Sequence, residues 1–102
     1  MKGATQFVFE PDVPLEEAEM TLHLAMFAVE GLAGRVRVCL DAKYLADPDN
    51  RSIYVTDGNR VAKMVVHIFT ALLFREFGED AFQVSQIDSF PQSPRQERTV
   101  PA

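Results

Sequence analysis

The sequence has very little cysteine and no long uninterrupted apolar run. Cys39 is the single cysteine among 102 residues, so an internal disulfide is excluded. The longest apolar-rich segment, residues 61–77, is interrupted by Lys63, His67 and Arg75, which argues against a lipid-spanning helix. No charged and then apolar leader opens the chain. We therefore expect a cytoplasmic protein with no membrane association.

Basic charge is also scarce. Ten lysines and arginines against fifteen aspartates and glutamates give a formal net charge of -5. This balance weakly repels phosphate backbones and does not favour a general nucleic-acid binder. The 47% hydrophobic and 25% charged residues are those of an ordinary folded protein, and a chain of this length supports one core.

The first part of the chain predicts a strand followed by a helix. Thr5 to Glu10 is rich in aromatic and β-branched residues, which favour a strand. Asp12 as a capping side chain, Pro14 and the glutamates behind them indicate the start of a helix. Its apolar residues recur at helical spacing, and Gly31 or Gly34 provides an end.

A β-hairpin is predicted next. From Arg35 to Tyr44 apolar and polar residues alternate, which is typical of a half-buried strand. Residues 46–50 are polar turn formers, and the alternation returns from Arg51 to Thr56. The two alternating segments are therefore expected to pair antiparallel.

A second helix and a last strand complete the predicted elements. Residues 57–59 are interpreted as a loop and N-cap for a helix covering Arg60 to Phe77. Gly78 stands where a C-cap glycine belongs. Alternation from Ala81 to Ile87 predicts the fourth strand.

This order of elements predicts an α+β fold of the ferredoxin-like split βαβ type (βαββαβ). Its four-stranded antiparallel sheet would have strand order 4-1-3-2, with two helices on one face. We place a single domain at residues 1–88 and a flexible, proline-containing C-terminal tail at residues 89–102. A terminal strand that is swapped, or exchanged between two copies, would have the same linear order.

No motif in the sequence carries an enzyme's chemistry. His23 and His67 lie in the two predicted helices, but without the His-x-x-x-His or Glu-x-x-His spacing of metal ligands. Cys39 has Arg37 nearby but no histidine close in sequence, and mid-strand cysteines are usually structural. No glycine-rich phosphate-binding pattern is present. We predict no catalytic residues, no cofactor and no metal.

Two kinds of ligand-binding module share the predicted order of elements. RNA-recognition modules stack bases on aromatic residues of the central strands, and Tyr54 with Phe7 or Val8 could form such a face. The segment from Arg51 to Thr56 lacks the glycine and paired aromatics of that family's motif. The layout also resembles regulatory modules of the ACT type, which bind amino acids between paired domains. That resemblance concerns topology alone and implies no site residues.

The most informative feature is the breadth of the apolar surface on both predicted helices. Packing between the two helices of one chain can bury one extra apolar stripe, but it cannot bury all the apolar side chains on these helices. Each large side chain left in water forgoes about 1.5 to 3 kcal/mol of burial. We therefore expect an interface, most simply in a dimer, formed by Met20, Leu24, Phe27, Met64, Leu73 and Phe74.

The function predicted from this excess of apolar side chains on the helices is that of a small, non-catalytic, self-associating interaction or ligand-binding module. A further protein or a small molecule is a possible partner of such a module. The alternative is a small enzyme or ligand-responsive domain whose pocket forms at the subunit interface and uses His23 or His67.

Overall fold

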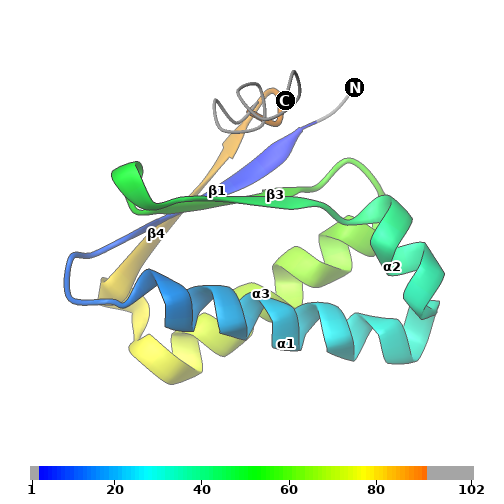
Figure 1. Ribbon diagram of the computed structural model, residues 1–102, viewed down its shortest axis with the longest axis horizontal. Helices are drawn as coiled ribbons and strands as arrows, with labels where there is room; N and C mark the ends of the chain where they lie inside the picture. Colours follow the sequence, from blue (N-terminus) through cyan, green and yellow to red (C-terminus); the bar gives the residue numbers. More distant parts are fainter. Residues whose placement is uncertain (1–2, 92–102) are drawn as a thin grey trace, which may run out of the picture.

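A four-stranded antiparallel sheet lies against a layer of helices in the computed structural model, which describes residues 3–91 (Figure 1). The α+β class predicted from the sequence is confirmed. Of the predicted tail, residues 92–102 lie outside the described residues. The strands are β1 (Ala4–Phe9), β2 (Tyr44–Asp47), β3 (Ser52–Thr56) and β4 (Phe82–Ile87), and the helices are α1 (Leu15–Ala33), α2 (Arg35–Asp41) and α3 (Arg60–Phe77).

The strands are ordered β2-β3-β1-β4 across the sheet. Read from the opposite edge, this is the order 4-1-3-2. The central strand β1 pairs antiparallel with β3 and with β4, so that Phe7 lies opposite Ile53 on one side and Val84 on the other. Side chains of successive residues point to opposite faces, and Phe7, Ile53 and Val84 therefore share the face that the helices cover (Figure 1).

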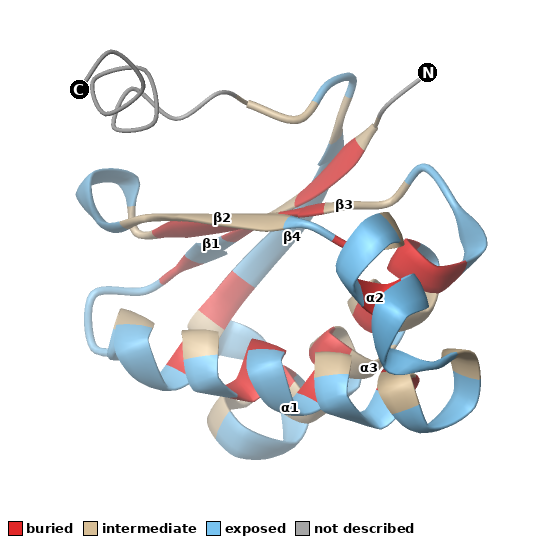
Figure 2. Ribbon diagram, turned by 45° about the vertical axis from the view of Figure 1, so that its right-hand side comes forward, coloured by how far each residue is buried: buried red, intermediate tan, exposed pale blue. Residues whose placement is uncertain are grey.

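The core lies between this face and the two long helices. Phe7 of β1, Leu22 of α1, Ile53 of β3 and Phe69 of α3 are fully buried. The rings of Phe7 and Phe69 meet edge to face with centroids 4.7 Å apart, a favoured aromatic arrangement. Figure 2 shows that the buried residues of α1 lie on its side toward the sheet.

The predicted strand from Arg35 to Tyr44 is wrong. Arg35–Asp41 forms α2, and β2 begins only at Tyr44, so residues 3–91 contain three α-helices instead of the predicted two. Gly34 has φ 94°, a left-handed conformation that glycine tolerates, and it ends α1 and redirects the chain into α2. Val38 is then buried against the core. The free energy gained by burying its side chain exceeds the small unfavourable helix propensity of valine.

The ends of the long helices were predicted with unequal success. Asn59 is the N-cap of α3, and its side-chain oxygen accepts a hydrogen bond from the Ala62 amide at 2.8 Å. Gly78 is the C-cap, so the predicted limits of α3 are confirmed. Asp12 does not cap α1, because the capping position is occupied by Pro14 and no side chain bonds there.

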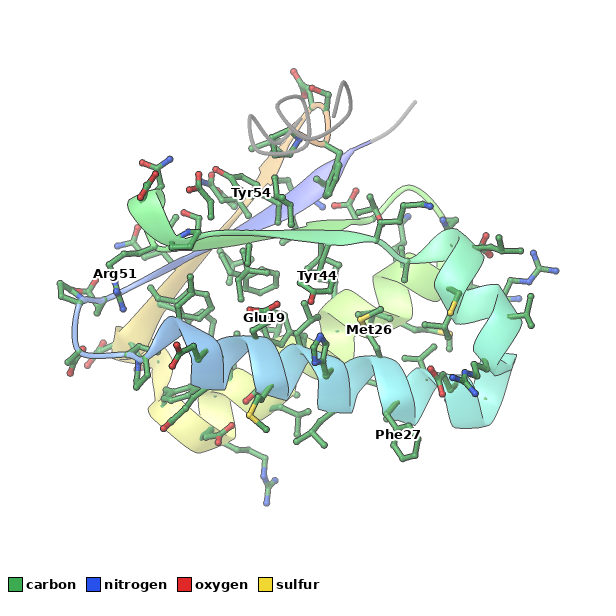
Figure 3. All side chains as sticks on the ribbon, in the orientation of Figure 1. Glu19, Met26, Phe27, Tyr44, Arg51 and Tyr54 are labelled. Carbon is green, nitrogen blue, oxygen red and sulfur yellow. The ribbon has the colours of Figure 1, made fainter. Side chains whose placement is uncertain are left out.

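Arg51 fastens the loop between β1 and α1 to the sheet. It has φ 51°, a left-handed conformation that is uncommon for a residue with a side chain. Its guanidinium donates hydrogen bonds to the carbonyl oxygens of Glu10 and Val13 (Figure 3). The start of α1 is thereby held beside the hairpin formed by β2 and β3.

Candidate functional site

An apolar stripe runs along the outer side of α1. Met20, Leu24 and Phe27 are 67%, 60% and 71% exposed. Their spacing of four and three residues places them on one side of the helix. Ala18, Leu22, Ala25 and Val29 occupy the opposite, buried side. In Figure 3, Phe27 points away from the sheet while the neighbouring Met26 points toward it. We call Met20, Leu24 and Phe27 the α1 stripe.

Leu73 does not belong to any surface, and its assignment to an interface is wrong. It is 0% exposed, because it follows Val65 and Phe69 at intervals of four residues on the side of α3 that packs against the sheet. The sequence analysis placed Leu73 among the outward-facing residues of this helix, whereas the buried side of α3 includes it.

Met64 and Phe74, both on α3, are less exposed than the residues of the α1 stripe. Met64 is partly buried against the core. Phe74 is 48% exposed, and its ring lies 5.3 Å from that of Phe82 on β4. Two residues further along α3, Glu76 accepts a hydrogen bond from Thr21 of α1 at 2.6 Å. Since residues two apart lie on different sides of a helix, Phe74 faces β4 and not α1.

A chain of hydrogen bonds joins α1 to β2. The Tyr44 hydroxyl donates to Glu19 Oε2 at 2.7 Å, and His23 Nε2 lies 2.9 Å from the same hydroxyl oxygen. The single hydroxyl proton of Tyr44 is used in the hydrogen bond to Glu19, so the hydroxyl oxygen acts as the acceptor for an N–H of the His23 imidazole. Figure 3 shows Tyr44 reaching down from the sheet toward Glu19.

Sequence reasoning missed this chain. His23 is exposed on α1. The spacing of four residues between Glu19 and His23 places them on one side of α1 and was an available signal. Tyr44 could not have been added from the sequence, because its position opposite α1 depends on where β2 lies in the sheet.

The environment of Tyr44 predicts a dependence of stability on pH. Burial, then the hydrogen bond to Glu19, then the negative charge of Glu19 raise the pKa of the Tyr44 phenol from 10.0 to about 12. The unfolded chain therefore loses this proton at lower pH than the folded chain does. Its contribution to stability is complete below pH 10 and disappears as the pH rises toward 12.

We expect Tyr44→Phe to flatten the decline in the free energy of unfolding between pH 10 and 12. Urea unfolding at a series of pH values measures this decline. Tyr54→Phe is the matched control, since Tyr54 is the second of the two tyrosines. Equal declines in wild type and Tyr44→Phe would contradict the assignment of this effect to Tyr44.

The open face of the sheet carries only part of the set of residues that was considered for base stacking. Phe7 is fully buried on the helix side and is not available for base stacking. Tyr54 lies on the open face, where its hydroxyl accepts a hydrogen bond from Gln6 at 3.2 Å. Val8 is exposed on the same face. The structure thus leaves one aromatic side chain from the proposed set on this face.

Cys39 and His67 occupy the surface. Cys39 is exposed on α2 and is not the mid-strand residue that was predicted. His67 and Lys63 of α3 line a hollow of about 210 Å³ with Thr5, Asp57 and Gln86. Among residues 3–91 there is no cluster of three or more histidine, cysteine, aspartate or glutamate side chains suited to a metal ion. Within the same range, no helix is both long enough and apolar enough to cross a membrane.

Comparisons with protein-family models, with curated proteins and with solved structures found no match to this chain.

Proposed function

We propose that this chain is a small, non-catalytic, cytoplasmic interaction module that forms a homodimer through the α1 stripe. The exposure of Phe27 in the middle of α1, with Met20 and Leu24 beside it, is the observation that carries the proposal. The module would be a ferredoxin-like sandwich to which α2 is added. A second copy of the chain is the partner that fits the α1 stripe. A two-fold axis would bring the stripes of the two copies together, so that each buries the apolar surface of the other.

The charges at the two ends of α1 support an antiparallel arrangement of two copies. Glu16 and Glu17 lie in the first turn of α1, and Arg35 and Arg37 follow its last residue. All four residues are exposed. If two α1 helices cross antiparallel near Leu24, the glutamates of each copy lie toward the arginines of the other. Such opposite charges favour this orientation over a parallel one.

Burial of apolar side chains makes the main favourable contribution to the free energy of dimer formation. Fully burying a large apolar side chain contributes about 1.5 to 3 kcal/mol. Each copy offers three of them in the α1 stripe. Association itself costs about 4 to 15 kcal/mol of lost translational and rotational freedom. We therefore expect a dissociation constant on the order of micromolar.

We expect Phe27→Glu to convert the dimer into a monomer while the chain stays folded. The substitution places a charge within the proposed contact but removes no buried side chain of the single chain. Sedimentation equilibrium at concentrations around and above micromolar measures the mass. Val8→Glu is the matched control, because Val8 is exposed on the open face of the sheet, away from α1.

The control variant should keep the mass of the wild type. A wild-type chain that stays monomeric well above micromolar concentration would contradict the proposal. So would a Phe27→Glu variant whose dimer is as stable as that of the wild type.

A second candidate function rests on the position of His23. It precedes Phe27 by one helical turn and ends the hydrogen-bonded chain through Tyr44 to Glu19. A second copy on the α1 stripe would close over this imidazole and form a small-molecule pocket at the interface. This pocket would belong to a small enzyme or ligand-responsive domain.

Thermal-shift measurements with metal ions and metabolites distinguish the second candidate from the first. A stabilising compound whose effect is lost in both His23→Ala and Phe27→Glu would support an interface pocket. The absence of any response, with a dimer still present, would reject the pocket and leave the dimer proposal intact.

A further inference from the structure

The edge of the sheet at β4 differs from the edge at β2. β2 has four residues and ends at Asp47, which Pro48 follows, so charge and proline limit pairing there. β4 has six residues, Phe82–Ile87, and contains neither a charged residue nor a proline. Among the described residues it pairs only with β1. Its outer edge therefore lacks the protection that edge strands usually carry.

The register shows which backbone groups of β4 point outward. Val8 lies opposite Gln83, and the Glu10 amide donates to the Ala81 carbonyl at 2.9 Å. Hydrogen-bonded and non-bonded pairs alternate in an antiparallel ladder, so Gln83 and Ser85 direct their amides toward β1. The amides and carbonyls of Phe82, Val84 and Gln86 consequently point away from the sheet.

An apolar groove lies beside this edge on the helix side. Val84 faces the helices but is 44% exposed, because α3 does not cover it. Phe74 of α3 contacts Phe82 at the start of β4. From Phe74 a hollow of about 410 Å³ continues along α3, lined by Val66, His67, Thr70, Ala71 and Phe74. A strand added to β4 would direct alternate side chains toward this hollow.

Acidic residues flank β4 at both ends. Glu79 and Asp80 precede it, and Asp88 follows it. A second copy pairing antiparallel around Val84 would place Asp80 of each copy opposite Asp88 of the other, and like charges in opposite positions destabilise a pair. Self-pairing is thus opposed, whereas a strand with basic ends would be attracted.

We propose that the β4 edge binds an extended peptide segment of another protein. The segment has apolar residues at alternate positions, which face Val84 and the groove on α3, and basic residues at its two ends, which face Glu79, Asp80 and Asp88. Its backbone extends the sheet as a fifth strand. This site lies outside the α1 stripe and is independent of dimer formation.

The test uses two fluorescent probe peptides and the monomeric Phe27→Glu chain. One probe is Lys-Val-Thr-Val-Thr-Val-Lys and the other is Glu-Val-Thr-Val-Thr-Val-Glu, both with blocked ends. Fluorescence anisotropy should show at least about tenfold tighter binding of the lysine probe. In Asp80→Lys/Asp88→Lys the preference should reverse.

Val84→Pro tests the backbone contact. Proline removes the amide that points outward but leaves the ladder to β1 intact, so the chain should fold and bind the lysine probe at least about tenfold more weakly. Gln83→Thr, whose side chain lies on the open face, is the matched control and should bind normally. Circular dichroism checks the fold of each variant.

Equal affinity for the two probes, or a preference unchanged by the charge swap, would overturn the proposal even if Val84→Pro failed to fold. Unchanged binding by a folded Val84→Pro would also overturn it. Protection of the Val84 amide from hydrogen exchange that increases with the concentration of the Phe27→Glu chain alone would assign the edge to a second copy instead. None of these results affects the test of the α1 stripe, which measures the mass of the wild-type chain.

Discussion

Phe69→Ala should lower the free energy of unfolding by about 3 to 5 kcal/mol. Phe69 is fully buried at the centre of the core, where its ring contacts that of Phe7 across the interface between α3 and β1. Alanine would leave a cavity between the helix layer and the sheet. Domains of this size have unfolding free energies of about 5 to 15 kcal/mol, so the variant would lose a large share of its stability. Urea denaturation followed by circular dichroism measures the loss.

Leu32→Ala is the control for this experiment. Leu32 is a large, exposed side chain near the end of α1, and its truncation should change the free energy of unfolding by no more than about 0.5 kcal/mol. Similar losses in the two variants would show that Phe69 does not occupy the core described above.

Aspartate substitutions at two adjacent positions of α3 should have opposite outcomes. Leu73→Asp should leave the chain unfolded at 25 °C, because a buried carboxylate without a partner costs several kcal/mol in addition to the lost apolar burial. Phe74→Asp should fold, with a loss of about 1 kcal/mol from the contact with Phe82. Circular dichroism and the cooperativity of thermal unfolding distinguish the two states.

The contrast tests the rotation of α3 about its axis. If Leu73→Asp also folded cooperatively, Leu73 would lie outside the core, as the sequence alone suggested. Leu73 would then return to the candidate interface.

The success at α3 and the failure at α2 have different physical causes. Asn59 and Gly78 act within one turn of the helix ends, so the limits of α3 could be inferred from neighbouring residues. The seven residues of α2 alternate between polar and apolar types. A segment so short is compatible both with the two-residue period of a strand and with the period of a helix. Burial of Val38 against the rest of the core selected the helix.

The candidate site was likewise only partly accessible to sequence reasoning. The spacing of Met20, Leu24 and Phe27 identified one exposed side of α1, because helical periodicity is a local property. Phe74 belongs to a different surface, and the contact with Phe82 that places it there joins segments that no local pattern relates.

By itself, the sequence determined the α+β class, α1 and α3 with their approximate or exact limits, and the excess of apolar side chains on α1. These features depend on periodicity and on caps, which act over a few residues. Only the tertiary structure decided that Arg35–Asp41 is helical, that Leu73 is buried and that Tyr44 meets Glu19 and His23. Each of these depends on the packing of distant segments, where the burial of one side chain outweighs a small local preference.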